Sequence, residues 1–144
     1  MVEFSLVVFA FLLVLFAAVS AAFHSIQRAS AETAAAAGVQ LAASGSAADP
    51  ATPAYGASFG PTRDLLTPVM FGTTIVQGQT RADCDAEARR AAHDTLMVCA
   101  YPDGPNLVAE RVVGIPNYII PFISQYVPWS IDVTVEMHQV SYQG

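Results

Sequence analysis

The sequence predicts an α+β protein: a long N-terminal transmembrane α-helix followed by a small antiparallel-sheet head with one helix. Three features predict it, namely an uncharged apolar run at the N-terminus, a charged helical segment near residues 80–95, and a C-terminal segment that alternates apolar and polar residues. We therefore divide the chain into a membrane helix with its alanine-rich extension (1–45), a Pro/Gly-rich linker (46–64) and an extracytoplasmic α+β head (65–144).

The run from Phe4 to Phe23 is apolar and long enough to cross a bilayer. Its polar residues are Ser5 and Ser20, and none of its side chains is charged. A helix of about 20 residues spans the ~30 Å hydrocarbon core. The alternative, a cleaved secretory signal, requires a basic segment before a shorter apolar core, and residues 1–3 contain no basic side chain. We therefore expect a retained helix whose partner is the lipid bilayer.

An alanine-rich extension, residues 24–44, is expected to continue this helix beyond the membrane. It contains no proline, and alanine has the highest helix propensity. Gly45 and Pro50 then provide signals for the end of the helix. The small side chains allow another helix to approach closely; a solvated alanine-rich stalk is the alternative.

The orientation of the membrane helix depends on few charges. Arg28 is the nearest basic residue, and by itself it would place the C-terminal side in the cytoplasm. A basic leader removed before Met1 would reverse this preference, because the missing charge would then have been on the other side. We expect the head to be extracytoplasmic, at the cell surface.

Two segments connect the membrane helix to the rest of the head. Residues 45–62 are rich in glycine and proline and contain almost no bulky apolar side chain, which predicts an extended connector. Residues 65–77 contain several β-branched and aromatic residues and predict the first strand of the head, closed by Gly78.

The helix of the head is expected over residues 80–95. Thr80 and Asp83, three residues apart, are candidates for capping its N-terminus. Asp85 and Arg89 have the i,i+4 spacing of an ion pair on a helix surface.

Three further strands are expected, over residues 96–101, 107–113 and 131–138. The last has a strict two-residue alternation, the pattern of a half-buried strand, and its apolar side chains are expected to face the helix near residues 81–94. Residues 118–129 contain two prolines among large apolar residues and form either core or a partner-binding surface. The inward-facing apolar residues of the last strand are Ile131, Val133, Val135 and Met137.

Two cysteines, Cys84 and Cys99, are either a disulfide in an oxidising compartment or buried thiols in a reducing one. A single straight helix covering both would separate them by roughly 22 Å, too far for a bond. Because the predicted helix should end near Asp94 and the next strand can return along it, we expect the two to be joined.

Composition and motifs argue against several classes of function. The net charge of −6, with 12 acidic and 6 basic residues, leaves no basic patch for nucleic acid. The acids at 83, 85 and 87 lack the glycine and terminal glutamate of a calcium loop, and the three histidines, at 24, 93 and 138, lack the spacing of zinc ligands. Neither a phosphate-binding loop nor a nucleophile elbow is present. We expect no enzymatic activity, no cofactor and no metal.

The N-terminus MVEFSLVVFAFLLVLF, in which Glu3 and Phe4 open the hydrophobic run, resembles the TadE-like pilin family of tight-adherence pili. The alanine-rich stretch SAETAAAAGVQLAA and the C-terminal YVPWSIDVTVEMH are also similar to that family. The resemblance covers residues 1–45 well and the C-terminal stretch loosely. It implies a structural, non-catalytic subunit with a small extracytoplasmic head.

The resemblance also implies a role for Glu3 and Phe4 in assembly. In the type IV pilin superfamily such a glutamate meets the free N-terminal amine of a neighbouring subunit, which offsets the cost of placing a carboxylate in an apolar bundle. The implied partners are copies of this chain or other pilin-like subunits. The alternative is an accessory single-pass subunit of a large respiratory or photosynthetic membrane complex.

Overall fold

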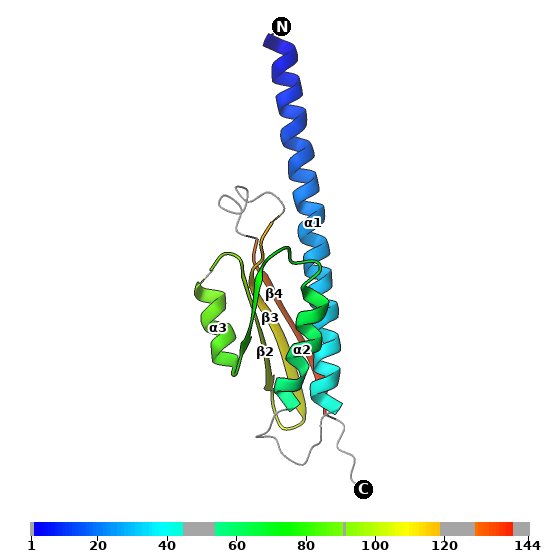
Figure 1. Cartoon of the computed structure of the whole chain (residues 1–144), viewed down its shortest axis with the longest axis vertical. Helices are drawn as coiled ribbons and strands as arrows, with labels where there is room; N and C mark the ends of the chain where they lie inside the picture. The colour runs from blue at the N-terminus through cyan, green and yellow to red at the C-terminus, as the bar shows by residue number, and fades with distance from the viewer. Residues whose placement is uncertain (1, 45–53, 91, 119–128, 140–144) are drawn as a thin grey trace.

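The chain folds into one long helix with an α+β head packed against its C-terminal half (Figure 1). The computed structural model describes residues 2–44, 54–90, 92–118 and 129–139. The predicted fold class, α+β with a long N-terminal helix, is confirmed. The elements are α1 (Val2–Ser44), α2 (Ala54–Leu66), β1 (Thr74–Gly78), α3 (Arg81–Arg90), β2 (Thr95–Pro102), β3 (Leu107–Ile115) and β4 (Ile131–His138).

Helix α1 is continuous over 43 residues, as the lack of proline in this region predicts. Its N-terminal half extends beyond the head, and its C-terminal half lies along the sheet (Figure 1). The predicted helical continuation is therefore confirmed through Ser44, while Gly45 and Pro50 lie outside the described residues. The two halves of one helix thus occupy different environments.

The four strands form one sheet in the order β1-β2-β3-β4. The pairs β2–β3 and β3–β4 are antiparallel, but β1 and β2 are parallel, with Thr74 opposite Thr95. The expectation of a purely antiparallel sheet is wrong at this edge. The physical reason is the position of α3, which leads the chain from the end of β1 back to the level at which β1 began, so that β2 runs in the same direction.

One face of the sheet packs on α1 and α2. Because side chains alternate along a strand, Ile131 and Val133 of β4 lie on this face together with Val112 of β3. The predicted inward face of β4 is confirmed, with Val135 and Met137 half-buried. The helix that it packs on is α1 and not α3 as expected. The small residues of α1 let the helix lie close to the strands. The buried cluster comprises Ala31, Ala34, Ala35, Leu66, Met70, Leu96, Val98, Val112, Ile131 and Val133.

The opposite face of the sheet is covered by α3. Its buried cluster includes Cys84 of α3 and Cys99 of β2, whose sulfurs are 2.00 Å apart. The predicted pairing of these cysteines is therefore present in the structure. The chain turns back between α3, which ends at Arg90, and β2, which begins at Thr95, as the predicted geometry requires.

Helix α2 occupies most of the segment that we expected to be an extended connector. That expectation is wrong from Ala54 onward, and residues 45–53 lie outside the described residues. The side chains of Ser58, Thr62 and Leu66, four residues apart, form one buried face. Packing of this face against α1 and the sheet stabilises a helix whose composition, with Pro61 inside it, is unfavourable.

The first strand is also shorter than expected. Leu65 and Leu66 end α2, and β1 begins only at Thr74. Between them the chain turns through Phe71 and Gly72, which both have positive φ angles, of 34° and 73°. This backbone conformation is unfavourable for phenylalanine, and it ends the extended pattern that the sequence of residues 65–77 predicts.

Helix α3 begins as its capping residues predict. The Asp83 carboxylate accepts hydrogen bonds from the backbone N–H groups of Gln79 and Thr80, both at 2.8 Å. The backbone N–H of Asp83 donates to the Thr80 hydroxyl, so the two residues form a reciprocal cap. The predicted Asp85–Arg89 pair is wrong, because Asp85 accepts a hydrogen bond from Arg111 of β3 at 2.6 Å instead.

Candidate functional site

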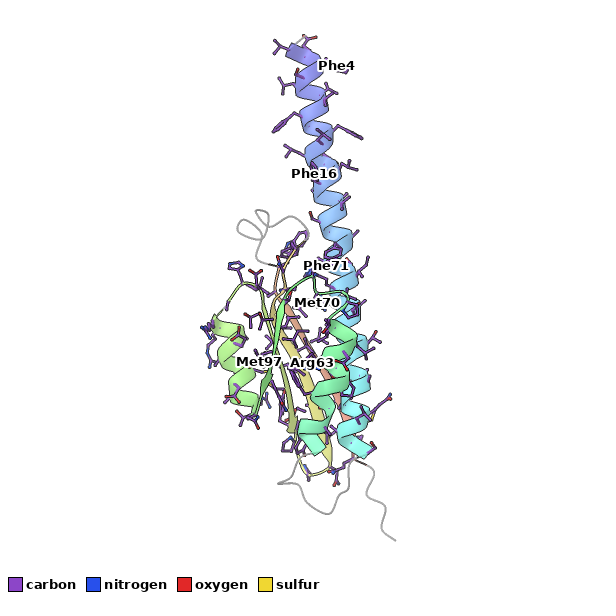
Figure 2. All side chains as sticks on the ribbon, in the orientation of Figure 1. Phe4, Phe16, Arg63, Met70, Phe71 and Met97 are labelled. Carbon is purple, nitrogen blue, oxygen red and sulfur yellow. A yellow bond between two sulfur atoms is a disulfide. The ribbon has the colours of Figure 1, made fainter. Side chains whose placement is uncertain are left out.

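The N-terminal half of α1 is an exposed apolar surface. Its large side chains, from Val2 to Val19, have exposed fractions between 39% and 77%. Among the described residues, α1 is the one helix that is long and apolar enough to cross a membrane, and none of its most apolar stretch is buried within the protein. Figure 2 shows these side chains, including Phe4 and Phe16, projecting around the helix beyond the head.

A helix that is apolar on all sides needs an apolar environment on all sides. Burial of a side chain such as Leu or Phe contributes roughly 1.5–3 kcal/mol relative to exposure in water. The head covers none of this segment, so lipid or other helices have to cover it. The segment is therefore compatible with a single-pass membrane subunit.

Glu3 and Phe4, the residues implied in assembly, lie in the first turn of α1. Glu3 is the acidic residue of that turn and is exposed, and Phe4 is 77% exposed. A carboxylate at a helix N-terminus is favoured by the helix dipole. Within the described part of the chain, Glu3 forms no ion pair. The position leaves both side chains accessible to a neighbouring molecule.

The C-terminal half of α1 attaches the head. Here the helix surface is formed by small residues, and at Gly38 the helix lies directly over the carboxylate of Glu110 on β3. A Cβ atom at Gly38 would lie 2.2 Å from both Glu110 Oε1 and Thr62 Oγ1. Glycine at this position therefore allows α1, α2 and β3 to meet.

Glu110 is a fully buried acid at this junction. Its Oε1 accepts a hydrogen bond from the Thr62 hydroxyl at 2.5 Å. Thr62 Oγ1 also lies 3.5 Å from the Ala34 carbonyl of α1. Among the described residues, Glu110 Oε2 has no hydrogen-bond partner. This arrangement suits a protonated carboxyl group, because a buried carboxylate requires partners for both oxygens.

Burial raises the pKa of Glu110 from 4.5 to about 7, and the hydroxyls of Thr62 and Ser58 partly oppose this rise. The Thr62 hydroxyl that donates to Glu110 also lies next to the Ala34 carbonyl, so the acid is held against α1 through Thr62. The acid therefore takes part in the attachment of the head to α1 in a form that depends on pH.

The face that carries the disulfide also contains an ion-pair network around Arg111. Its guanidinium donates to Asp85 of α3 at 2.6 Å and to Asp132 of β4 at 2.7 Å. The hydrogen bonds that Arg111 donates to Asp132 and Asp85 raise the pKa of Arg111, and the same contact lowers the pKa of Asp85. These bonds join α3 to the centre of the sheet beside the Cys84–Cys99 pair.

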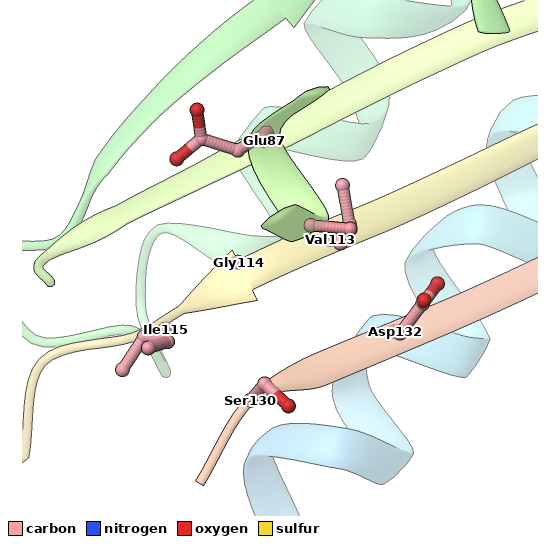
Figure 3. A pocket seen from close by; sticks show the side chains of 7 residues that line it. Glu87, Val113, Gly114, Ile115, Ser130 and Asp132 are labelled. Carbon is pink, nitrogen blue, oxygen red and sulfur yellow. The ribbon is translucent and has the colours of Figure 1, made fainter. Parts of the chain in front are cut away.

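A pocket of 230 Å³ lies between the C-terminal part of α3 and the adjoining ends of β3 and β4 (Figure 3). Glu87 is buried on its wall, with Oε1 lacking a partner within the described residues. The other carboxylate, Asp132, is already held by Arg111. The lining residues are Glu87, Ala88, Val113, Gly114, Ile115, Ser130 and Asp132.

The three histidines considered as metal ligands lie in separate places, whereas the acids at 83, 85 and 87 all lie on α3. His24 lies on α1 against Trp129, His93 is next to the start of β2, and His138 ends β4. In the described ranges, no three His, Cys, Asp or Glu side chains gather in a way that could hold a metal ion.

Sequence reasoning missed Glu110, although its signal is present in the sequence. Glu110 lies between Val108 and Val112 at the two-residue period that places all three on one face of β3. An acid in phase with buried valines indicates a buried carboxyl group. The proximity of Gly38 and Thr62 to Glu110 could not be predicted from this period, because the two residues belong to helices distant in the sequence.

Comparison of the chain with protein-family models, with curated proteins and with solved structures finds no match.

Proposed function

We propose that this protein is a structural, TadE-like pilin subunit that crosses the membrane once and assembles through the N-terminal half of α1 into a pilus or a pilus-assembly complex. The observation that carries the proposal is the division of α1 into an exposed apolar half and a half that is packed into the head. An apolar rod of this kind serves equally as a membrane anchor and as the helix through which like subunits pack.

Glu3 is the residue that distinguishes assembly from simple anchoring. It lies next to the exposed apolar surface and precedes Glu32, the next acid along the helix. In a bundle of apolar helices its carboxylate requires a cationic partner, for which the family resemblance suggests the N-terminal amine of a neighbouring subunit. Phe4 then packs between adjacent helices.

The test compares the assembled fraction of the chain with its membrane pool. Glu3→Ala is expected to leave the head folded and the chain membrane-inserted but to abolish assembly, and Glu3→Asp to impair it in part because the shorter side chain misplaces the charge. Glu32→Ala is the matched control, since Glu32 is an exposed acid of the same helix that pairs with Arg28. Unimpaired assembly of Glu3→Ala would refute the proposal and favour an accessory subunit of a larger membrane complex.

We also propose that the head is extracytoplasmic. The Cys84–Cys99 pair supports this, because disulfides persist in oxidising compartments. Protein isolated under denaturing conditions with thiols blocked is expected to resist alkylation at both cysteines until it is reduced. Ready alkylation before reduction would contradict the extracytoplasmic location. Intact-mass measurement of the same sample identifies the N-terminus present in the assembled protein.

A further inference from the structure

An aromatic cluster lies beside α1 at the point where its apolar run ends. We call it the aromatic collar and define it as Phe23, His24, Phe71, Tyr118 and Trp129. The Phe23 and Phe71 rings are 4.9 Å apart, and the His24 and Trp129 rings are 5.1 Å apart. Tyr118 packs edge-on against Trp129 and donates its hydroxyl proton to the Trp129 carbonyl at 2.8 Å.

Hydrogen bonds fix the segments that carry the collar to one position along α1. The Gln27 amide donates to the Asn117 carbonyl at 3.1 Å, and the Asn117 backbone N–H donates to the Thr73 hydroxyl at 2.8 Å. Thr73 in turn donates to the Met70 carbonyl. The turn before β1 and the segment after β3 are thereby fixed to the helix. Phe23 is the last residue of the apolar run, and α1 is one continuous helix. The collar therefore has a fixed position at the end of that run.

Phe71 is the exposed member of the collar. Its side chain is 47% exposed, at the turn where the backbone has positive φ. Figure 2 shows Phe71 at the end of the head that faces the N-terminal half of α1. A large apolar side chain in this position meets water unless something covers it. When the apolar run spans the hydrocarbon core, Phe71 lies near the boundary between headgroups and acyl chains, where apolar side chains such as Phe and Leu can be buried.

The same end of the head carries unpaired positive charge. Helix α3 ends there with Arg89 and Arg90, both exposed. Of the six arginines in the chain, the other four form ion pairs, and these two form none with the described residues. Asp94 follows in the sequence with the opposite charge but forms no ion pair with either arginine. The helix dipole of α3 favours a basic last turn, but it does not provide an acidic partner.

We propose that the aromatic collar and the C-terminal end of α3 form a lipid-docking surface, on which Phe71 contacts the acyl-chain boundary and Arg89 and Arg90 bind anionic headgroups of the bilayer that α1 crosses. The proposal rests on the membrane-spanning part of the proposed function and is independent of assembly. Docking fixes the head against the membrane before the chain joins any larger structure.

The experiment uses the full chain in liposomes and its own fluorescence, because Trp129 is the one tryptophan of the sequence. The liposomes contain phosphatidylcholine alone or with phosphatidylglycerol, and a fraction of the lipid carries bromine near the headgroup end or near the methyl end of the acyl chain. Flotation shows whether the chain is inserted. We expect headgroup-proximal bromine to quench Trp129 more strongly than distal bromine.

Variants separate the two parts of the surface. Phe71→Ala is expected to reduce the quenching, and Leu41→Ala to leave it unchanged. Leu41 is a matched control because its side chain is 46% exposed, close to the value for Phe71. It lies roughly 27 Å from Phe23 along α1, at ~1.5 Å per residue, and so is far from the collar. Replacing Arg89 or Arg90 by Gln is expected to lower the ratio of docked to undocked heads by roughly five-fold each in phosphatidylglycerol, with no effect in phosphatidylcholine alone.

Four other outcomes would contradict membrane spanning, docking, headgroup binding or the choice of lipid as the partner. A chain that does not float with liposomes refutes the membrane-spanning part of the proposed function together with docking. A chain that floats but whose Trp129 is not quenched by either lipid refutes docking alone. Quenching that is indifferent to phosphatidylglycerol and to the arginine variants removes the headgroup contact. Quenching that disappears as the protein-to-lipid ratio rises assigns the collar to a second copy of the chain and overturns the lipid proposal.

Discussion

Replacing Glu110 by Gln is expected to change how the stability of the head depends on pH. In the folded protein, burial raises the pKa of Glu110 from 4.5 to about 7. The unfolded chain releases this proton near pH 4.5, whereas the folded head retains it up to about pH 7. The neutral acid therefore makes its full contribution to stability below pH 4.5, and this contribution is lost as the pH rises toward 7.

The magnitude follows from the two pKa values. The difference between 4.5 and about 7 corresponds to about 3 kcal/mol in the free energy of unfolding. A glutamine has the shape of the neutral acid but does not titrate. Its second amide N–H lacks an evident acceptor, which costs about 1–3 kcal/mol, but this cost is the same at every pH.

The assay is urea unfolding of the full chain in detergent micelles with the disulfide intact, followed by Trp129 fluorescence. The quantity measured is the stability difference between Glu110→Gln and the parent, at about pH 4 and about pH 8. We expect this difference to shift by about 3 kcal/mol in favour of the variant between the two conditions. All other titrating groups are shared by the two proteins, so their contributions cancel.

Glu136→Gln is the matched control, because Glu136 is an exposed glutamate of the same sheet. Its difference from the parent is expected to be nearly independent of pH. A shift for Glu110→Gln of less than about 1 kcal/mol, or an equal shift for both variants, would refute the assignment of a raised pKa to the buried acid.

Two further predictions concern the packing of the head, and both use the same unfolding measurement. Gly38→Ala places a methyl group against the Glu110 carboxylate and is expected to destabilise the head by about 1–3 kcal/mol. At Gly60 a Cβ meets nothing within 4 Å, so Gly60→Ala is expected to stabilise α2 by up to about 1 kcal/mol. Similar effects from the two substitutions would show that α1 does not lie over Glu110. Val133→Asp buries a charge on the face that packs on α1 and is expected to unfold the head, whereas Thr134→Asp on the exposed face is expected to be mild; equal effects would refute the assigned face.

The strands and helices with strong local signals could be predicted closely. Segment 131–138 alternates through its whole length, and β4 has these bounds. The caps of α3 were also predicted, because Thr80 and Asp83 bond within one turn of the chain. In these cases the residues that specify the element are neighbours in sequence.

The elements predicted wrongly are those whose stability comes from distant contacts. Helix α2 contains Pro61 and two glycines, and its helical state depends on burying Thr62 and Leu66 against other elements. The direction of β1 relative to β2 depends on the crossover through α3. The pairing of Asp85 with Arg111 and not with Arg89 depends on the register of β3 beneath α3.

The sequence by itself determined that one long apolar helix precedes a small α+β head, because an uninterrupted apolar run and a two-residue alternation are local patterns with few structural solutions. It also determined that Cys84 and Cys99 could meet only if the chain turned back between them. The tertiary structure alone decided that the C-terminal half of α1 packs on the sheet of its own head, that Gly38, Thr62 and Glu110 form one junction, and that Phe71 meets Phe23 where the apolar run ends. Those contacts join residues far apart in the chain, and their geometry depends on how close α1 lies to the sheet. The small residues on the buried face of α1 permit a short distance, but no local sequence pattern specifies it.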